Sequence, residues 1–178
     1  MSDIPLFVFK VMIIGEKGVG KSTFVKSFSL SKFDENTKLT IGIDFYTLDH
    51  PIIINGEHKF IRFSIWVFEP NSPFRKMTTY YFEGSNAIFI MFDVSNLNSL
   101  KNVDAWMELI NKQKRFKPYI LLLGNKIDLI SQPDKLRKFA EPIVNKYQLA
   151  GYYDISALHS TNTKLPFVHI AEYLLPKF

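Results

Sequence analysis

The 178-residue sequence contains no cysteine, and this absence excludes several kinds of chemistry at once. Disulfide bonds, cysteine-ligated metals and cysteine nucleophiles are all ruled out. No apolar stretch approaches the roughly 20 residues of a membrane-spanning helix. No basic segment precedes the first apolar run, which therefore indicates a core strand and not a signal peptide. We expect a cytoplasmic protein.

Long runs of one charge are also missing. The net charge is +5, but no five consecutive residues are Lys or Arg, so we expect no nucleic-acid partner. The mild basic excess suits phosphate ligands, an acidic membrane surface or simply a solvated surface. Repeats, low-complexity tracts and Pro/Gly/Ser-rich linkers are absent too, which predicts a single domain over residues 1–178.

What the sequence does contain is an alternation of strand-like and helix-like segments. Apolar runs and strand signals predict strands at Leu6–Ile14, Phe45–Ile54, Lys59–Phe68, Ala87–Val94, Tyr119–Leu123 and Gly151–Ile155. Helical spacing predicts helices at Ser22–Leu30, Leu100–Lys112, Leu136–Tyr147 and Leu165–Leu174, the last with Pro166 in its first turn.

This order predicts an α/β fold with a mostly parallel sheet and helices on both faces. Asn55-Gly56, the strongest two-residue turn signal, predicts one hairpin and hence one antiparallel edge strand. Ligands of such sheets bind at the carboxyl ends of the strands, so the loops there are the place to look for function.

The first of these loops has the sequence GEKGVGKS, from Gly15 to Ser22, between a strand and a helix. It matches the phosphate-binding pattern G-x-x-x-x-G-K-[ST]. Its glycines let backbone N–H groups surround a phosphate, and the helix N-terminus adds positive potential. The Lys21 ammonium can reach the outer phosphates, and the Ser22 hydroxyl can bind Mg²⁺. The alternative is an ordinary glycine-rich turn.

Two further loops can recognise a purine base. Asn125, Lys126 and Asp128 follow the strand Tyr119–Leu123. A carboxylate at Asp128 can accept hydrogen bonds from guanine N1–H and the 2-amino group, a donor pair that adenine lacks. After the next strand, the backbone of Ser156-Ala157-Leu158 can approach the base oxygen.

In this order the three loops resemble those of the Ras superfamily of small GTPases, from about Val8 to Leu175, and most of all its Rab branch. The segments that carry the Rab likeness are Thr40–Phe45, Ile65-Trp66, Thr78–Gly84 and Phe92–Ser95. The resemblance implies a small G domain of the P-loop NTPase class. It also implies a six-stranded sheet, five helices and bound GDP or GTP with Mg²⁺.

The resemblance also implies roles for individual residues. Those for the phosphates are Gly15, Gly18, Val19, Gly20, Lys21, Ser22, Thr23 and Thr40, with Ser22 and Thr40 on Mg²⁺. Those for the base are Phe33, Asn125, Lys126, Asp128, Ser156, Ala157 and Leu158. Those of an effector surface are Ile41, Phe45, Trp66 and Tyr81; the three aromatic residues alternatively pack together as a satellite cluster.

One segment departs from the family. After Trp66 the family has Asp-Thr-Ala-Gly-Gln-Glu, whereas this chain has Val67-Phe68-Glu69-Pro70-Asn71-Ser72. Val67 lacks the acceptor that holds Mg²⁺, and Pro70 lacks the N–H that senses the γ-phosphate. Asn71, at the position of the catalytic Gln, is one methylene shorter. Because positioning supplies most of the rate in phosphoryl transfer, we expect weakened Mg²⁺ binding and slow or absent hydrolysis.

Two residues could change the expected Mg²⁺ binding or the expected rate of hydrolysis. Lys17, in the phosphate loop, either reaches the γ-phosphate, obstructs an arginine finger from a partner, or points into solvent. Glu69 faces the same side as position 67 in an extended strand and could replace the missing carboxylate, although it lies several ångströms away.

The sequence therefore predicts an atypical Rab-like protein that binds guanine nucleotide and acts as a slow switch or binding module in vesicle trafficking. The alternatives are a GTPase completed by a partner and a nucleotide-locked pseudo-GTPase scaffold, with an ATPase disfavoured by Asp128. We expect a monomer with effector partners. The final Leu174–Phe178 are not a lipidation signal, so we expect peripheral binding to endomembranes only if a lipidated tail follows them; the alternative is that the protein is not lipidated.

Overall fold

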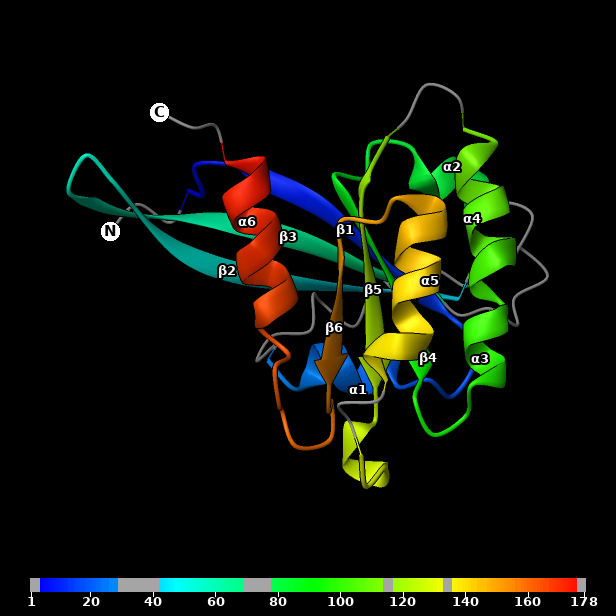
Figure 1. The fold of residues 1–178 in the computed structure, drawn as a ribbon. Helices are drawn as coiled ribbons and strands as arrows, with labels where there is room; N and C mark the ends of the chain where they lie inside the picture. Colours follow the sequence, from blue (N-terminus) through cyan, green and yellow to red (C-terminus); the bar gives the residue numbers. More distant parts are fainter. Residues whose placement is uncertain (1–3, 29–41, 69–77, 114–116, 133–135, 176–178) are drawn as a thin grey trace.

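Strands and helices alternate along the chain in the computed structural model, which describes residues 4–28, 42–68, 78–113, 117–132 and 136–175 (Figure 1). The strands are β1 Val8–Gly15, β2 Ile43–Ile54, β3 Glu57–Phe68, β4 Ala87–Asp93, β5 Tyr119–Asn125 and β6 Gly151–Ile155. The helices are α1 Lys21–Lys26, α2 Thr78–Phe82, α3 Asn98–Lys101, α4 Val103–Asn111, α5 Arg137–Tyr147 and α6 Leu165–Leu174, with a 3₁₀ turn, η3, at Ile127–Leu129.

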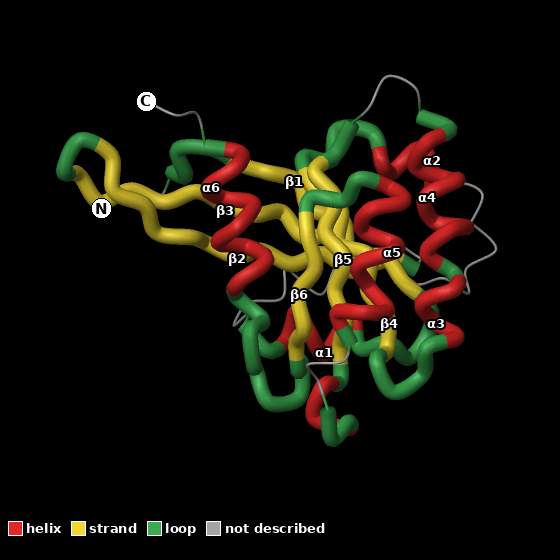
Figure 2. The backbone as a smooth tube through the Cα atoms, viewed as in Figure 1, coloured by secondary structure: helices red, strands yellow, loops and turns green. Residues whose placement is uncertain are grey.

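The six strands form one sheet in the order β2-β3-β1-β4-β5-β6. β2 runs antiparallel to β3 at one edge, and the other neighbouring strands are parallel. The predicted α/β fold with one antiparallel edge strand is therefore confirmed. Asn55 and Gly56 have φ angles of 52° and 78°, as a two-residue hairpin turn requires. The β2–β3 hairpin projects beyond the helices on the left of Figure 2.

Helices cover both faces of the sheet, and a hydrophobic core lies under each set. On one face, side chains of β1, β3, β4 and β5 pack against α1 and α6, with Phe24 and Phe167 stacked at 6.0 Å between ring centroids. On the other face, the core lies beneath α2, α3, α4 and α5 and includes the buried Trp106. Every residue of β4 is buried, which explains why all of its residues before the final Asp93 are apolar.

The last helix, α6, is tied to the sheet by a polar contact. The Tyr119 hydroxyl lies 2.9 Å from His169 Nε2, and the Tyr153 hydroxyl lies 2.9 Å from His169 Nδ1. Tyr173, farther along α6, stacks on Tyr119 at 3.8 Å. Both nitrogens of the imidazole ring therefore have hydroxyl partners, one on β5 and one on β6.

Some predicted boundaries were wrong. The first strand begins at Val8 and not Leu6, although Leu6 N still donates to Phe60 O at 2.8 Å. The helix predicted at Leu100–Lys112 is two helices, α3 and α4, which meet at Asn102. The α2 helix was not predicted, because the β-branched and aromatic sequence TTYYF has little helix propensity. Among the described helices, none is long and apolar enough to span a membrane.

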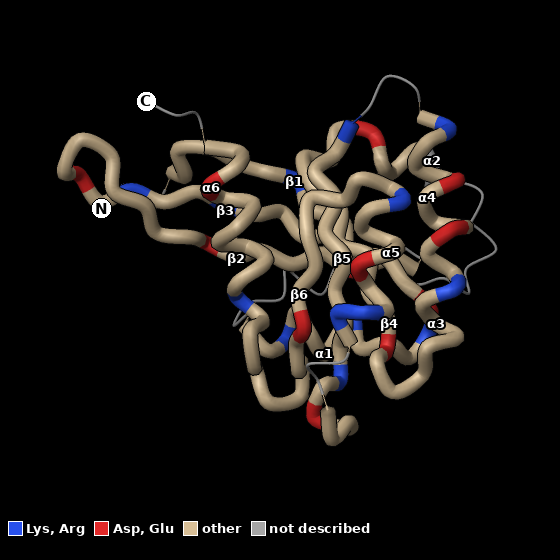
Figure 3. Tube along the Cα trace, viewed as in Figure 1, with Lys and Arg blue, Asp and Glu red and all other residues tan. Residues whose placement is uncertain are grey.

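Blue and red segments are interspersed over the described elements in Figure 3. Several opposite charges meet in pairs, for example Arg62 with Asp49 at 2.6 Å and Lys146 with Asp104 at 3.0 Å. Exposed pairs of this kind contribute little to stability, so the fold depends mainly on its two cores.

Candidate functional site

The phosphate loop follows β1 directly and leads into α1, as the motif requires. Gly18 and Gly20 have φ angles of 82° and 96°, in the left-handed region that favours glycine. Ser22 is half-buried in the first turn of α1, and Thr23 is exposed. The loop lies with η3 and the end of β6 at the lower edge of the sheet in Figure 1, where the parallel strands end.

Lys21 is 3% exposed, and its ammonium lies inside the loop. Its Nζ donates to the carbonyl oxygens of Gly15 at 3.1 Å and Glu16 at 2.9 Å. A loop that wraps a buried ammonium in this way can offer the same charge to phosphate oxygens, since an ammonium can exchange one oxygen acceptor for another.

Asn125 joins the phosphate loop to both loops predicted to read the base. Its side-chain nitrogen donates to Val19 O at 2.8 Å, and its side-chain oxygen accepts from Ala157 N at 2.9 Å. The residue is 1% exposed, so both hydrogen bonds are sheltered from water. A Cβ at Gly20 would collide with the Asn125 amide nitrogen, which is why this position accommodates only glycine.

The remaining residues predicted to read the base meet around Ser156. The Ser156 hydroxyl donates to Asp128 Oδ1 at 2.5 Å and accepts from His159 N at 3.2 Å. Ser156 also pairs with Thr161 through a short antiparallel bridge. Leu158, in contrast, is 70% exposed, so of the three predicted residues of this loop its side chain is the one directed to solvent.

Lys126 has a partner that the sequence did not suggest. Its Nζ lies 2.6 Å from Asp93 Oδ2 at the end of β4. Burial of Asp93 favours its neutral form, but hydrogen bonds from Lys126 and Ser95 outweigh burial and lower the pKa of the carboxyl. Asp93 was predicted only as part of a strand end. The parallel pairing of Asp93 with Asn125 is what brings it beside Lys126.

The end of β3 is apolar, unlike the polar ends of β5 and β6. Val67 is fully buried between Ile13 of β1 and Asp44 of β2, and it belongs to the core that contains Val19 of the phosphate loop. Phe68 is fully buried on the other face against Trp106, with centroids 6.3 Å apart. Neither side chain has an oxygen atom. Ser22 is therefore the one predicted metal ligand within the described residues, which also contain no cluster of three or more acidic or histidine side chains suited to a metal.

The comparisons with known proteins agree with this geometry. The family model described as "Ras family" matches residues 10–175. The chain belongs to the Ras family of small GTPases. It is 32% identical to Ras-related protein Rab-11C of Dictyostelium discoideum over 161 residues, 90% of this chain and 70% of that protein. It is 30% identical to Ras-related protein Rab-13 of Rattus norvegicus over 170 residues, 96% of this chain and 81% of that protein.

Within the Ras family the chain is Rab-like, so the predicted resemblance is confirmed. A third relative, Ras-related protein Rab11A of Lotus japonicus, is 29% identical over 92% of this chain and 70% of its own length. Small GTPases of this family bind guanine nucleotide with Mg²⁺, which fits the enclosed Lys21 and the Asn125 bridge of this Ras-family chain.

The aromatic residues predicted for an effector surface do contact one another in this Ras-family chain. The rings of Phe45 and Trp66 meet edge to face at 4.7 Å, and those of Trp66 and Tyr81 lie 6.4 Å apart. The Lys10 ammonium lies 4.0 Å from the Trp66 ring and donates to Tyr81 O at 2.7 Å. The three aromatic side chains are half-buried, so they pack as a cluster and still present a surface.

Lys17 is exposed, as one of its three alternatives required. It lines a small pocket of about 250 Å³ beside the phosphate loop, which Asn98, Ser99 and Asn102 also line. Its contact with a γ-phosphate or with a partner's arginine stays a prediction.

Several predicted residues lie outside the described part of the chain. They are Phe33, Thr40, Ile41, Glu69, Pro70 and Asn71. The roles assigned to these six residues stay predictions.

Proposed function

We propose that this Ras-family chain binds guanine nucleotide and hydrolyses GTP slowly, acting as a Rab-like regulator or binding module in vesicle trafficking. The observation that carries the proposal is the Asn125 bridge, which holds Val19 of the phosphate loop and Ala157 of the base loop at 2.8 and 2.9 Å. Two loops that would bind opposite ends of a nucleotide are thereby fixed to one another before it arrives. Such preorganisation reduces the entropy cost of binding.

Each loop then has its own part in binding. The phosphates are held by backbone N–H groups of the phosphate loop, by Lys21 and by Thr40. The base is held by Asp128, with Lys126 along its face and Phe33 packed against it. The Ser156 hydroxyl, 2.5 Å from Asp128 Oδ1, fixes the carboxylate that would accept from guanine. A fixed acceptor discriminates well, because a base without the matching donors leaves it unsatisfied.

Slow hydrolysis follows from the residues after Trp66. Val67 is buried and apolar, so Mg²⁺ would rely on Ser22, Thr40 and the phosphate oxygens themselves. Pro70 and Asn71 replace the residues that would sense the γ-phosphate and orient water. Each replacement removes positioning or charge stabilisation from the transition state.

The nucleotide released when the purified protein is denatured tests the first half of the proposal. Guanine nucleotide in roughly equimolar amount supports it. Protein that carries no nucleotide and takes up neither added GDP nor added GTP would contradict it and favour an empty scaffold. Bound ATP or ADP would contradict it in favour of an ATPase.

Single-turnover hydrolysis of bound GTP tests the second half. We expect the wild type to be slower than the triple variant Val67→Asp, Pro70→Gly, Asn71→Gln by roughly 100-fold or more, the range seen when groups that position or stabilise the transition state are removed. A matched control carries Val67→Asn with the same two other changes, because it places a similar polar group in the core without a carboxylate. Equal rates for the wild type and the triple variant would refute slow hydrolysis.

A further inference from the structure

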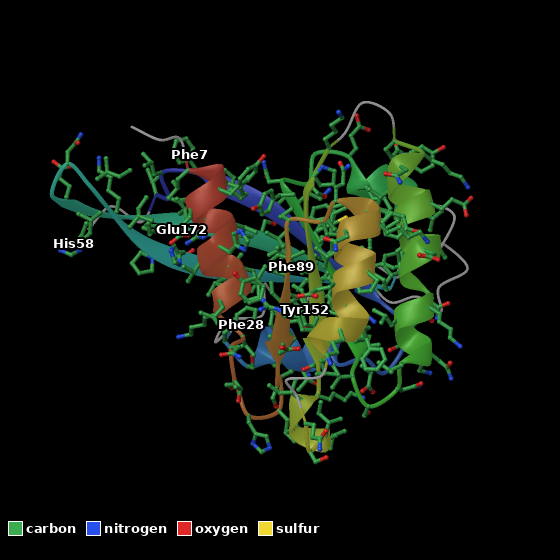
Figure 4. All side chains as sticks on the ribbon, in the orientation of Figure 1. Phe7, Phe28, His58, Phe89, Tyr152 and Glu172 are labelled. Atoms are coloured by element: carbon green, nitrogen blue, oxygen red, sulfur yellow. The ribbon has the colours of Figure 1, made fainter. Side chains whose placement is uncertain are left out.

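The side chain of Tyr152 fills the space beside Gly124, the residue immediately before Asn125. A Cβ at Gly124 would collide with the Tyr152 hydroxyl oxygen and would lie 2.9 Å from Val94 Cγ1. The ring of Tyr152 also stacks on Phe92, with centroids 6.1 Å apart. Figure 4 labels Tyr152 beside β6. Tyr152 therefore packs directly behind the start of a base-reading loop.

The same hydroxyl also forms a hydrogen bond within its own strand, β6, which leads into the other predicted base loop. It donates to Asp154 Oδ1 on β6. Asp154 is paired with Gly124, and Ile155 with Asn125, so the hydroxyl sits where β5 and β6 both end. Burial raises the pKa of Tyr152, and the hydrogen bond and charge of Asp154 raise it further, so the hydroxyl stays a proton donor at neutral pH.

The ends of β5 and β6 determine how the proposed base site is assembled. Asn125 and Asp128 follow β5, and Ser156 and Ala157 follow β6. Two hydrogen bonds connect the groups across this junction, from Ser156 to Asp128 at 2.5 Å and from Ala157 to Asn125 at 2.9 Å. A shift of β6 along β5 would strain both bonds, because hydrogen bonds weaken steeply with distance and angle.

We propose that Tyr152 is a positioning residue for base recognition, whose hydroxyl packs against Gly124 of β5 and hydrogen-bonds to Asp154 of its own strand, so that the adjoining ends of β5 and β6, and with them Asp128, keep their place. The inference rests on the proposed function, since it assigns a supporting residue to the same site. Tyr152 acts through Asp154 and Gly124 and does not touch the nucleotide. Supporting residues of this kind commonly decide whether a site is held tightly enough to discriminate.

The test compares Tyr152→Phe with Tyr153→Phe. Tyr153 is the neighbouring residue on the same strand, its side chain packs in the opposite core, and its hydroxyl also has a polar partner, His169 Nδ1 at 2.9 Å. Each variant loses one hydroxyl from β6. The measured quantities are the dissociation rates of fluorescent GDP and fluorescent IDP, whose hypoxanthine lacks the 2-amino group, together with thermal unfolding of each variant.

We expect Tyr152→Phe to speed GDP release by about threefold to tenfold, the range of a coupled residue outside the site. The ratio of IDP to GDP release rates should fall, because a displaced Asp128 gains less from the 2-amino group. Tyr153→Phe should leave both rates within about twofold of the wild type while its unfolding temperature falls similarly.

The double variant Tyr152→Phe, Asp154→Asn provides a second test, in which the rate of GDP release is compared with that of each single variant. Tyr152→Phe and Asp154→Asn remove the same hydrogen bond, so their effects on GDP release should be less than additive. Additive effects, or a Tyr152→Phe variant with unchanged rates and unchanged ratio, would overturn the inference while leaving guanine nucleotide binding intact. A wild type that fails to retain GDP would instead overturn the proposed function and this inference with it.

Discussion

At the ends of β5 and β6 polar side chains connect one loop to the next, whereas the last two side chains of β3, Val67 and Phe68, are apolar and buried. Asn125 bonds to two other loops, and Ser156 bonds to Asp128. Val67, on the other side of the phosphate loop, is fully buried among apolar neighbours. Binding a base and activating a phosphate are separate tasks. The ends of β5 and β6 carry the polar groups expected for the first, whereas the end of β3 lacks those expected for the second. Substitutions at Asn125, Val67 and Asp93 change the first region, the second region and the neighbouring end of β4 in turn.

The largest effect is expected from Asn125→Ala, which would break the base-reading region. The change removes two buried hydrogen bonds and leaves Val19 O and Ala157 N without this partner. At about 1.4 kcal/mol for each bond, the affinity for GDP should fall about 100-fold. Calorimetric titration of nucleotide-free protein measures it. Asn111→Ala, at an exposed asparagine that is the last residue of α4, is the control. An equal loss of affinity in both variants would show that Asn125 has no specific part in nucleotide binding.

An intermediate effect is expected when Val67→Asp gives the β3 end a carboxylate. In the wild type, chelation of Mg²⁺ with EDTA should speed GDP release by less than about fivefold, because the protein supplies few metal ligands. In the Val67→Asp variant the acceleration should exceed that value, since the new carboxylate couples metal to nucleotide. Val67→Asn separates this gain from the cost of a polar group in the core. A strong EDTA effect in the wild type would show that another residue, such as Glu69, holds the metal.

The smallest effect is expected from Asp93→Asn, which weakens the contact between β4 and Lys126. The lowered pKa means that the ionised carboxylate stabilises the folded protein above the ordinary carboxyl pKa of 3.8, and that this contribution is lost as the pH falls through the lowered value. Urea unfolding at pH 7 should show a loss of about 1 kcal/mol for the variant. The difference should shrink below about pH 4. A constant difference at both pH values would argue against the ion pair.

Local signals in the sequence were enough to predict the order of strands and the loops at their ends. The phosphate loop lies within eight consecutive residues, and the Asn55-Gly56 turn needs only two, so both can be recognised without a fold. The boundary at Asn102 was missed because helical spacing continues on both sides of it. Propensity also failed at α2, whose aromatic residues pack against β3 and α4 and so gain their helical state from tertiary contacts.

Contacts that cross the sheet could not be predicted in the same way. Asp93 and Lys126 are 33 residues apart, and only the register of β4 and β5 brings them together. Tyr152 looks in the sequence like any aromatic residue of a buried strand. Its hydroxyl has room beside β5 only because Gly124, 28 residues earlier, has no side chain. Residues that would support a site only through such long-range contacts are therefore the hardest to predict from the sequence.

The contact of His169 with two tyrosines has a consequence for spectroscopy. A neutral imidazole carries one proton, so one ring nitrogen donates to a hydroxyl while the other accepts from one. Tyr119 and Tyr153 must then play opposite parts, and a change of tautomer would exchange them. The chemical-shift difference between the two ¹⁵N resonances of this ring would thus report whether α6 is packed on the sheet. The two resonances would stay well separated while the helix is docked and move toward one another when it loosens.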